Sequence, residues 1–456
     1  MVGGVTATDS DATADAAAID RLARLVSVPT VSKADVEQTQ WSAFERFREV
    51  LAECYPLVHE RLERELIADH TIVMRWRGLG DCAPAVLMAH QDVVDPGDEA
   101  SWAHPPFAAE IVGDGDDRAL WGRGAIDDKG SLVGILEAVE HQLAAGFQPS
   151  RDVWLVFGHD EETHGSGALA AATVFAERGI RPEFVLDEGG AIVSGFLPGV
   201  AAPIAAIGLA EKGVVSIGLA VDEPGGHGST PPPISAIGRL ARAIARMDAK
   251  PFPARFTATA RAMFEAAGTG ATGAIGALYR GAGVTGPILR RALAKAGPEG
   301  DAMTRTTRVA TVIEGGHAEN AIPERARATV NVRVLPGETV ASAVEYIRAA
   351  INDPLVTVTL LAGSEPSPES PASGPGWDQI VAAIAEIVPD AIATPYTQTG
   401  ATDSRRFTTI CNRVYRFTPF DLTSAERAAL HAVDELVRLS SWLRGVAVYR
   451  ALVSRL

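Results

Sequence analysis

Between residues 84 and 207, short apolar runs alternate with segments of helical spacing. The runs AVLMAH, DVWLVFG and EFVLD are typical of buried strands, and the segments between them repeat apolar residues every three or four positions. The clearest helix follows Lys129 and ends at Gly146, which can adopt the left-handed conformation of a helix C-terminus. Strands that alternate with helices predict an α/β domain.

The pattern changes at about residue 208. VVSIGLAVDE and RATVNVRVLPG alternate with period two, and helices are predicted over SAIGRLARAIARM and from Thr339 to about Ile351. A Gly/Ala-rich stretch at 255–305 interrupts these elements. After the Ser/Pro-rich segment GSEPSPESPASGPG, the helix WDQIVAAIAEIV resumes the first pattern. The second pattern therefore reads as an insertion in the first.

The length of 456 residues favours two domains, because a single core rarely serves so long a chain. The order of the patterns predicts a discontinuous α/β domain formed by residues 1–207 and 363–456, with a mixed central sheet flanked by helices. Residues 208–362 are expected to form an inserted α+β domain.

Charge and cysteine content narrow the possible partners and compartments. With 41 Lys+Arg against 57 Asp+Glu, the net charge of -16 argues against nucleic acid or an anionic membrane as a partner. Three scattered cysteines give neither a disulfide framework nor a thiolate zinc site, which favours a reducing cytoplasm. Residues 1–20 lack the features of a signal peptide and are predicted to be a short disordered lead. No apolar stretch is long enough to predict a membrane span.

Two acidic or histidine-bearing patterns follow the first strand. His90 and Asp92 are two residues apart, so both side chains can face one site, with Asp92 fixing the tautomer of a metal-binding imidazole. The pair is also typical of an ordinary strand end. Asp127 and Asp128 start the next helix, where a simple cap is the alternative, but the flanking glycines indicate a tight turn in which a carboxylate can bridge two cations.

Acidic residues also follow the next two strands. Asp160, Glu161 and Glu162 follow DVWLVFG after His159, and three adjacent acids repel one another unless a cation lies among them. One glutamate can then bind a metal while the other accepts a proton from water. Asp187 ends the run EFVLD and Glu188 follows it, in the same way. The sequence therefore predicts a metal site at the ends of successive strands.

Eight sequence blocks resemble those of one enzyme family and occur in the family's order. They are HxDVV, GRGAxDDKG, HDEExxGSGA, DEGG, GGHGSTPP, NxIPxxAxAxxNxRxLPG, ATDSRRF and HxVDE, between about residues 85 and 436. They resemble the family of co-catalytic zinc peptidases that contains aminoacylase-1, carboxypeptidase S and succinyl-diaminopimelate desuccinylase. The forms GHDEE and DEGG are most similar to the carboxypeptidase S branch, which includes vertebrate N-acyl-amino-acid hydrolases.

The resemblance implies two zinc ions per subunit, with cobalt or manganese as substitutes. It implies that Asp127 bridges the ions, that Glu161 is the general base and that Asp92 orients a ligand histidine. The Asp127–Asp128 peptide is expected to be cis. The remaining ligands implied by the resemblance are His90, Glu162, His431 and either Glu188, which we favour, or Asp187. His431 is assigned on the resemblance alone, because its apolar surroundings are more typical of a structural histidine.

The resemblance also gives the inserted domain a role. It implies a lid that forms a homodimer and carries His227 toward the substrate carbonyl oxygen, often in the active site of the partner. Asn320 and Arg333 match positions that hold the substrate carboxylate. Ser404 and Arg405 are expected in a further loop on the substrate side.

The predicted function is hydrolysis of an amide bond next to a free amino-acid carboxylate, by metal-activated water. The substrate is then an N-acyl amino acid or a short peptide cut as by a carboxypeptidase. A dipeptidase or aminopeptidase is the main alternative and needs a site for a free α-amine, whereas Arg333 favours a carboxylate. A homologue that only binds its ligand is a more distant alternative.

Overall fold

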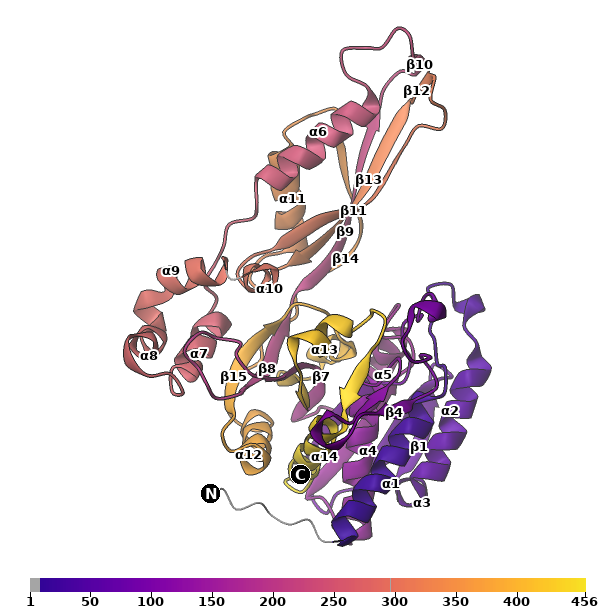
Figure 1. Ribbon diagram of the computed structural model, residues 1–456, viewed down its shortest axis with the longest axis vertical. Coiled ribbons are helices and arrows are strands. Elements are labelled where there is room, and N and C mark those ends of the chain that lie inside the picture. Colours follow the sequence, from indigo (N-terminus) through magenta and orange to yellow (C-terminus); the bar gives the residue numbers. More distant parts are fainter. Residues whose placement is uncertain (1–8, 296) are drawn as a thin grey trace.

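The larger of the two main sheets has eight strands and forms the base of the molecule in the computed structural model, which describes residues 9–295 and 297–456 (Figure 1). In spatial order its strands are β1 (Glu63–Ile67), β2 (Thr71–Trp76), β6 (Arg151–Gly158), β3 (Cys82–His90), β7 (Phe184–Val193), β16 (Val414–Asp421), β8 (Ile204–Glu211) and β15 (Ile392–Gln398). The sheet is mixed, and β6, β3, β7 and β16 run parallel to one another. The carboxyl ends of these four strands therefore meet at one edge.

Helices cover both faces of this sheet, because the strands bury side chains on both sides. On one face lie α1 (Asp9–Val26), α2 (Trp41–Cys54), α3 (Pro56–Arg61), α4 (Lys129–Ala144), α12 (Trp377–Ile387) and α14 (Leu439–Val453). On the other face lie α5 (Ser166–Glu177) and the short helical segment Asp403–Thr409. The indole of Trp442, which is fully buried, donates a hydrogen bond to the carbonyl oxygen of Gly130 at 3.0 Å. This contact joins α14 to α4.

The inserted unit projects away from the larger sheet (Figure 1). Its antiparallel sheet has the order β11 (Thr307–Gly315), β13 (Arg325–Val334), β9 (Gly213–Asp222) and β14 (Thr357–Ser364). Alternate residues of β9 and β13 are buried against α6 (Ala236–Ala249) and α11 (Val340–Ile351), which form a core of their own with the sheet. A short ribbon of β10 (Gly226–His227) and β12 (Ala321–Ile322) lies at the outer end. We call this unit the lid.

The Gly/Ala-rich stretch does not join the core of the lid. It forms α7 (Ala258–Ala267), α8 (Gly273–Arg280), α9 (Ala282–Leu293) and α10 (Pro298–Ala302). Buried residues of α7 to α9, such as Phe264 and Tyr279, belong to the core of the larger sheet. This part of the insertion therefore extends the larger unit, and the lid is the remainder.

A three-stranded sheet brings a late segment of the chain to the edge of the larger sheet where the metal site is predicted. Its order is β17 (Leu436–Arg438), β5 (Ala119–Trp121) and β4 (Glu110–Val112). The helix α13 (Ser424–Ala429) precedes β17, so the loop between them lies beside the turn that follows β5. Residues 430–435 and 122–127 are thereby neighbours.

The α/β class with a mixed, helix-flanked sheet is confirmed, but one local prediction is wrong. Of the predicted disordered lead, residues 1–8 lie outside the described residues, and α1 begins at Asp9. Alanine-rich sequence favours helix, and Leu22, Leu25 and Val26 of α1 are fully buried in the core. Among the residues described, no helix is both long and apolar enough to cross a membrane.

Candidate active site

His90 ends β3 and is almost completely buried. Its Nδ1 lies 2.9 Å from the carbonyl oxygen of Asp92, which only accepts hydrogen bonds, so Nδ1 carries the proton. Nε2 faces carboxylates, 3.0 Å from Asp127 Oδ1 and 3.8 Å from Glu188 Oε1. Although burial opposes it, the hydrogen bonds to Asp127 and Asp92 raise the pKa of His90 well above its usual value. Nε2 is thus the nitrogen at which a metal would displace a proton.

Asp92 lies beside the imidazole of His90 and also holds the segment that contains Glu161 and Glu162. Its carboxylate is fully buried and accepts a hydrogen bond from the hydroxyl of Ser32 at 2.7 Å. It also accepts hydrogen bonds from the backbone N–H groups of Glu161 and Glu162, each at 3.2 Å. Asp92 therefore fixes the glutamate pair relative to the end of β3.

Asp127 lies between two imidazoles, and its peptide bond to Asp128 is cis, as expected. Its Oδ2 is 3.0 Å from Nε2 of His431, and the same nitrogen lies 3.1 Å from Glu162 Oε2. His431 has a φ of +61° and comes from the loop between α13 and β17. The structure thus brings His90, Asp127, Glu162 and His431 together, although they are distant in sequence.

A buried carboxylate that sequence reasoning missed holds two of these segments together. Glu435 has no exposed surface, and it accepts hydrogen bonds from the N–H groups of Gly124, Ile126 and Asp127 at 3.0, 2.9 and 3.1 Å. It also pairs with Arg123 at 2.7 Å. The signal was present in the sequence, because both Glu435 and Arg123 belong to the blocks HxVDE and GRGAxDDKG.

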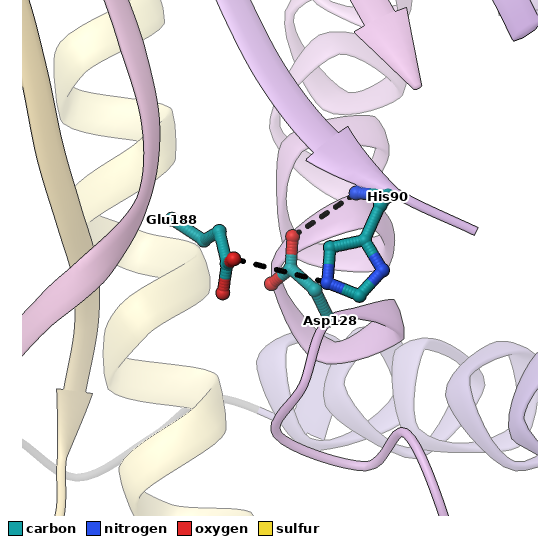
Figure 2. Close-up of side chains that lie close together, drawn as sticks. All are labelled: His90, Asp128 and Glu188. Atoms are coloured by element: carbon teal, nitrogen blue, oxygen red, sulfur yellow. Dashed lines mark hydrogen bonds and ion pairs between the residues drawn. The ribbon is translucent and has the colours of Figure 1, made fainter. Parts of the chain in front are cut away.

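The two acids of the DEGG block have different surroundings. Glu188 faces His90, whereas Asp187 is buried and accepts a hydrogen bond from the backbone N–H of Ser404 at 2.7 Å. Asp128, expected only as a neighbour of Asp127, lies on the same side as Glu188 and accepts a hydrogen bond from the N–H of His90 at 3.2 Å (Figure 2). Among these acids, the geometry favours Glu188 over Asp187 as a ligand and adds Asp128 to the candidates.

Two overlapping groups of side chains have the spacing of metal ligands. His90, Asp128 and Glu188 offer ligand atoms within 4.8 Å of one another, and so do His90, Asp127 and Glu162. Oxygen and imidazole nitrogen donors of this kind suit zinc, cobalt and manganese. His431 lies within 3.1 Å of a carboxylate oxygen of the second group.

The charges of the side chains in these two groups favour a bound cation. Burial and the nearby carboxylates of Asp127 and Asp128 raise the pKa of Glu188 well above its usual value, and burial also raises the pKa of Glu162. Hydrogen bonds to Asp127 and Glu162 raise the pKa of His431 to about 10. Within the described residues, the buried Oε1 of Glu162 accepts no hydrogen bond. A cluster of side chains with this excess of carboxylates fits a divalent metal.

Glu161 lies beside these groups and is left free. Among the described residues, its carboxylate has no hydrogen bond or ion pair. Burial, together with the charges of Asp403 and Glu162, raises the pKa of Glu161 well above its usual value. Its loop is rigid, because Asp160 accepts hydrogen bonds from the N–H groups at the start of α5, including that of Gly167 at 2.9 Å. Such a carboxylate can accept a proton.

Asp403 is a second buried acid that the sequence did not single out. It precedes Ser404 and lies against the end of β6, where a Cβ at Gly158 would be 2.1 Å from Asp403 Oδ2. This contact explains the glycine that ends the run DVWLVFG.

The lid residues predicted to contact the substrate lie in two separate places. His227 and Asn320 are exposed neighbours at the outer end of the lid, where the N–H of Gly228 donates to the carbonyl oxygen of Asn320 at 2.9 Å. That ribbon lies at the opposite end of the lid from the larger sheet (Figure 1). A single chain therefore does not bring His227 or Asn320 to the candidate metal ligands.

Arg333, by contrast, lies at the base of the lid. It is half-buried near the end of β13, and its Nε donates to Asn331 Oδ1 at 3.2 Å. Arg405 donates to the carbonyl oxygen of Glu365 at 2.8 Å, and Ser404 is fully buried. Burial lowers the pKa of both guanidinium groups, and the charge of Arg333 contributes to the shift at Arg405. Two cations are thus near each other where the lid joins the larger unit.

Comparison with known proteins gives matches along almost the whole chain. Residues 86–455 match the profile of Peptidase family M20/M25/M40. A probable carboxypeptidase S-like 2 from Dictyostelium discoideum is 34% identical over 440 residues, covering 95% of this chain and 84% of that protein. An N-fatty-acyl-amino acid synthase/hydrolase from Homo sapiens is 31% identical over 424 residues, covering 91% and 83%.

Solved structures share the fold at lower identity. A metallo-carboxypeptidase of the M20 family from Sulfolobus solfataricus superposes with a TM-score of 0.67 at 16% identity, covering 96% of this chain and 98% of that one. Human carnosine dipeptidase 1 gives a TM-score of 0.66 at 14% identity, covering 97% and 96%. The family profile, the relatives and the fold agree. The chain belongs to peptidase family M20/M25/M40 and is a metallohydrolase.

Proposed function

We propose that this protein hydrolyses the amide bond of N-acyl amino acids, or the C-terminal bond of short peptides, and releases a free amino acid. The observation that carries the proposal is the free, half-buried carboxylate of Glu161 beside two overlapping groups of candidate metal ligands. The relatives support the choice of substrate, because their names describe carboxypeptidase S-like proteins and N-fatty-acyl-amino acid hydrolases.

The proposal assigns two zinc ions to the site. His90, Asp127 and Glu188 would hold one ion, and Asp127, Glu162 and His431 would hold the other. When bound, such ions polarise the amide carbonyl and make water acidic enough to react near neutral pH. Asp128 and Asp187 then serve to position the ends of β3 and β7, through their bonds to His90 and Ser404.

Glu161 is proposed to transfer the proton. Its carboxylate accepts a proton from the attacking water, whose oxygen bonds to the amide carbon, and later gives that proton to the nitrogen as the C–N bond breaks. Asp92 and Asp160 hold the loop of Glu161 through backbone hydrogen bonds, so the carboxylate is kept in place. The products are a carboxylic acid and an amino acid.

Arg333 and Arg405 are proposed to recognise the free carboxylate of the substrate, with Ser404 shaping the same loop. Half-burial makes the charge of a guanidinium more effective, and a planar fork matches a carboxylate. This choice separates the proposal from a dipeptidase or aminopeptidase, which must also bind an α-amine.

A second copy of the chain is proposed to complete the site. His227 and Asn320 are exposed at the far end of the lid, and edge strand β11 leaves Val309, Val312 and Ile313 exposed, as an interface would. In a dimer, His227 of one chain would bind the carbonyl oxygen of the substrate in the other, near Asn320.

The first prediction concerns Glu161. Replacing it with Gln removes the proton acceptor but keeps the size of the side chain, so kcat should fall by about a hundred- to ten-thousand-fold. Zinc content, measured by atomic emission after gel filtration, should not change. Glu177→Gln, an exposed change on α5, is the control. A Glu161→Gln enzyme with near-normal kcat would remove Glu161 from the proposed mechanism.

The second prediction concerns the substrate carboxylate. An N-acyl amino acid should be cleaved with a kcat/KM at least about tenfold above that of its carboxamide, because a charged hydrogen bond is lost in the amide. Arg333→Gln should raise KM for the acid and leave the carboxamide unaffected, and Arg327→Gln on the same strand should change neither. Faster cleavage of unblocked dipeptides, insensitive to Arg333, would support the dipeptidase alternative instead.

The third prediction concerns Glu435, which holds Asp127 in place. Glu435→Gln should weaken zinc binding by about ten- to a hundredfold in equilibrium dialysis, because the amide cannot accept all four hydrogen bonds. Glu137→Gln is the matched control, since Glu137 is a similarly buried acid bonded to Arg21 and Tyr55. Both variants should melt at lower temperature, and equal loss of zinc in both would contradict the assignment.

The fourth prediction concerns the dimer. His227→Ala and Glu161→Gln chains should each be nearly inactive, and a refolded equal mixture should recover about a quarter of the wild-type rate, because half the dimers are mixed and each has one complete site. Activity is measured at constant total protein. A mixture no more active than its parents would mean that each site is complete within one chain.

A further inference from the structure

The segment between Glu265 and Glu299 differs in charge from the rest of the chain. Acidic residues make up 57 of 456 positions, about one in eight, yet residues 266–298 contain none. The same 33 residues contain four cations, Arg280, Arg290, Arg291 and Lys295. A chain of net charge -16 therefore has one stretch that is locally basic. This stretch forms α8 and α9, at the outer edge of the molecule (Figure 1).

Apolar side chains of the same two helices are exposed. Val284 and Ile288 of α9 are 88% and 62% exposed, and Ile275 of α8 is 40% exposed. Val284 and Ile288 are one turn apart, and Arg291 continues the same side of the helix in the next turn. Lys295 follows two residues after the helix ends at Leu293. We call these five residues, Ile275, Val284, Ile288, Arg291 and Lys295, the α8–α9 surface.

The two cations of this surface are available for a partner. Arg280 and Arg290 donate to backbone carbonyl oxygens, those of Gly268 and Ala254, at 2.7 and 3.0 Å. Arg291 and Lys295 are exposed, and among residues 9–295 and 297–456 their side chains have no hydrogen bond or ion pair. The acid at the near end of α9, Glu265, lies 3.8 Å from Arg261.

The helices are held firmly from behind, so the exposed side chains do not belong to a loose segment. Leu289 and Leu293 of α9 are buried in the core of the larger sheet. The hydroxyl of Tyr279 donates to the carbonyl oxygen of Pro198 at 2.9 Å. A helix that is packed on one side and still apolar on the other marks an interaction surface.

We propose that the α8–α9 surface docks this protein onto an anionic lipid surface. Aliphatic side chains flanked by long cationic ones are the pattern of helices that lie at a bilayer interface, where Lys and Arg reach the headgroups. The net charge does not prevent such docking, because charges farther than about 8 Å are screened at physiological salt. A second copy of this surface is a poor occupant, since Arg291 and Lys295 would face their own counterparts across a twofold axis.

Docking of this kind does not depend on the proposed function, although the two are compatible. A long-chain N-acyl amino acid is an amphiphile and partitions into lipid, so a docked enzyme would meet it at the membrane. The surface and the candidate metal site are formed by separate parts of the same unit.

Co-sedimentation with vesicles tests the proposal on the full chain. Phosphatidylcholine vesicles with about one third phosphatidylserine should bind the protein, pure phosphatidylcholine should bind it much less, and 0.5 M salt should release it. The double variants Val284→Asp/Ile288→Asp and Arg291→Glu/Lys295→Glu should each lower the bound fraction by at least about tenfold. The control, Leu79→Asp/Arg64→Glu, alters an exposed leucine and arginine elsewhere and should bind as wild type.

Each other outcome overturns the proposal. Circular dichroism and the melting temperature establish that the variants are folded, which these exposed positions should allow. Wild-type protein that ignores both kinds of vesicle, or α8–α9 variants that bind as well as wild type, would refute lipid docking. If ultracentrifugation shows a wild-type oligomer that the Val284→Asp/Ile288→Asp variant loses, while vesicle binding is absent, the surface is an interface between copies.

Discussion

The hydrogen bonds accepted by Glu435 join the two parts of the chain that form the candidate metal site. Gly124 and Glu435 are 311 residues apart in sequence, and one carboxylate accepts hydrogen bonds from three backbone N–H groups of the turn that precedes the cis peptide of Asp127. Only four residues before Glu435, His431 reaches the other side of the Asp127 carboxylate at 3.0 Å. Both histidines can therefore meet the same carboxylate only while this buried contact is intact.

Crowding of buried carboxylates is the second constraint on the site. Burial raises the pKa values of Asp128, Glu161 and Glu188, and the imidazoles of His90 and His431 lie beside these acids. The larger sheet can hold these acids because its strands are anchored by an extensive apolar core on both faces. A bound cation lowers the repulsion, so metal binding and folding of this edge are thermodynamically linked. The stability of the fold and the chemistry of the site are thus not independent.

Several strands and the approximate location of the site could be predicted from the sequence, because they depend on local patterns of residues. Apolar runs before His90 and Glu161 placed the site at strand ends, and the structure has the ends of β3 and β6 there. Glu188 was also expected after a strand, but it lies within β7, which continues to Val193. Period-two alternation likewise predicted β9 and β13. These features depend on residues close together in sequence, for which side-chain periodicity is informative.

What could not be predicted depends on contacts between distant segments. The block HxVDE marks Glu435 but does not indicate which distant turn its carboxylate binds, and Asp187 and Glu188 differ only in which side of β7 they face. The packing of α7 to α9 on the larger sheet is a tertiary contact of the same kind. The order of helix α1 also comes from burial against the core, which its polar first turns do not indicate.

The position of β16 has a consequence for how the protein is made. This strand lies between β7 and β8 in the larger sheet, yet the ribosome produces it only after the whole lid. At ordinary rates of synthesis, on the order of ten to forty seconds separate β8 from β16. Through that interval the first part of β7, which pairs with β16 from Val185 to Asp187, has an unpaired edge. The lid, whose strands β9 to β14 are consecutive, already has all the parts of its own core. The lid is thus expected to fold first, and the catalytic sheet to close last, which makes the nascent chain a substrate for chaperones until β16 emerges.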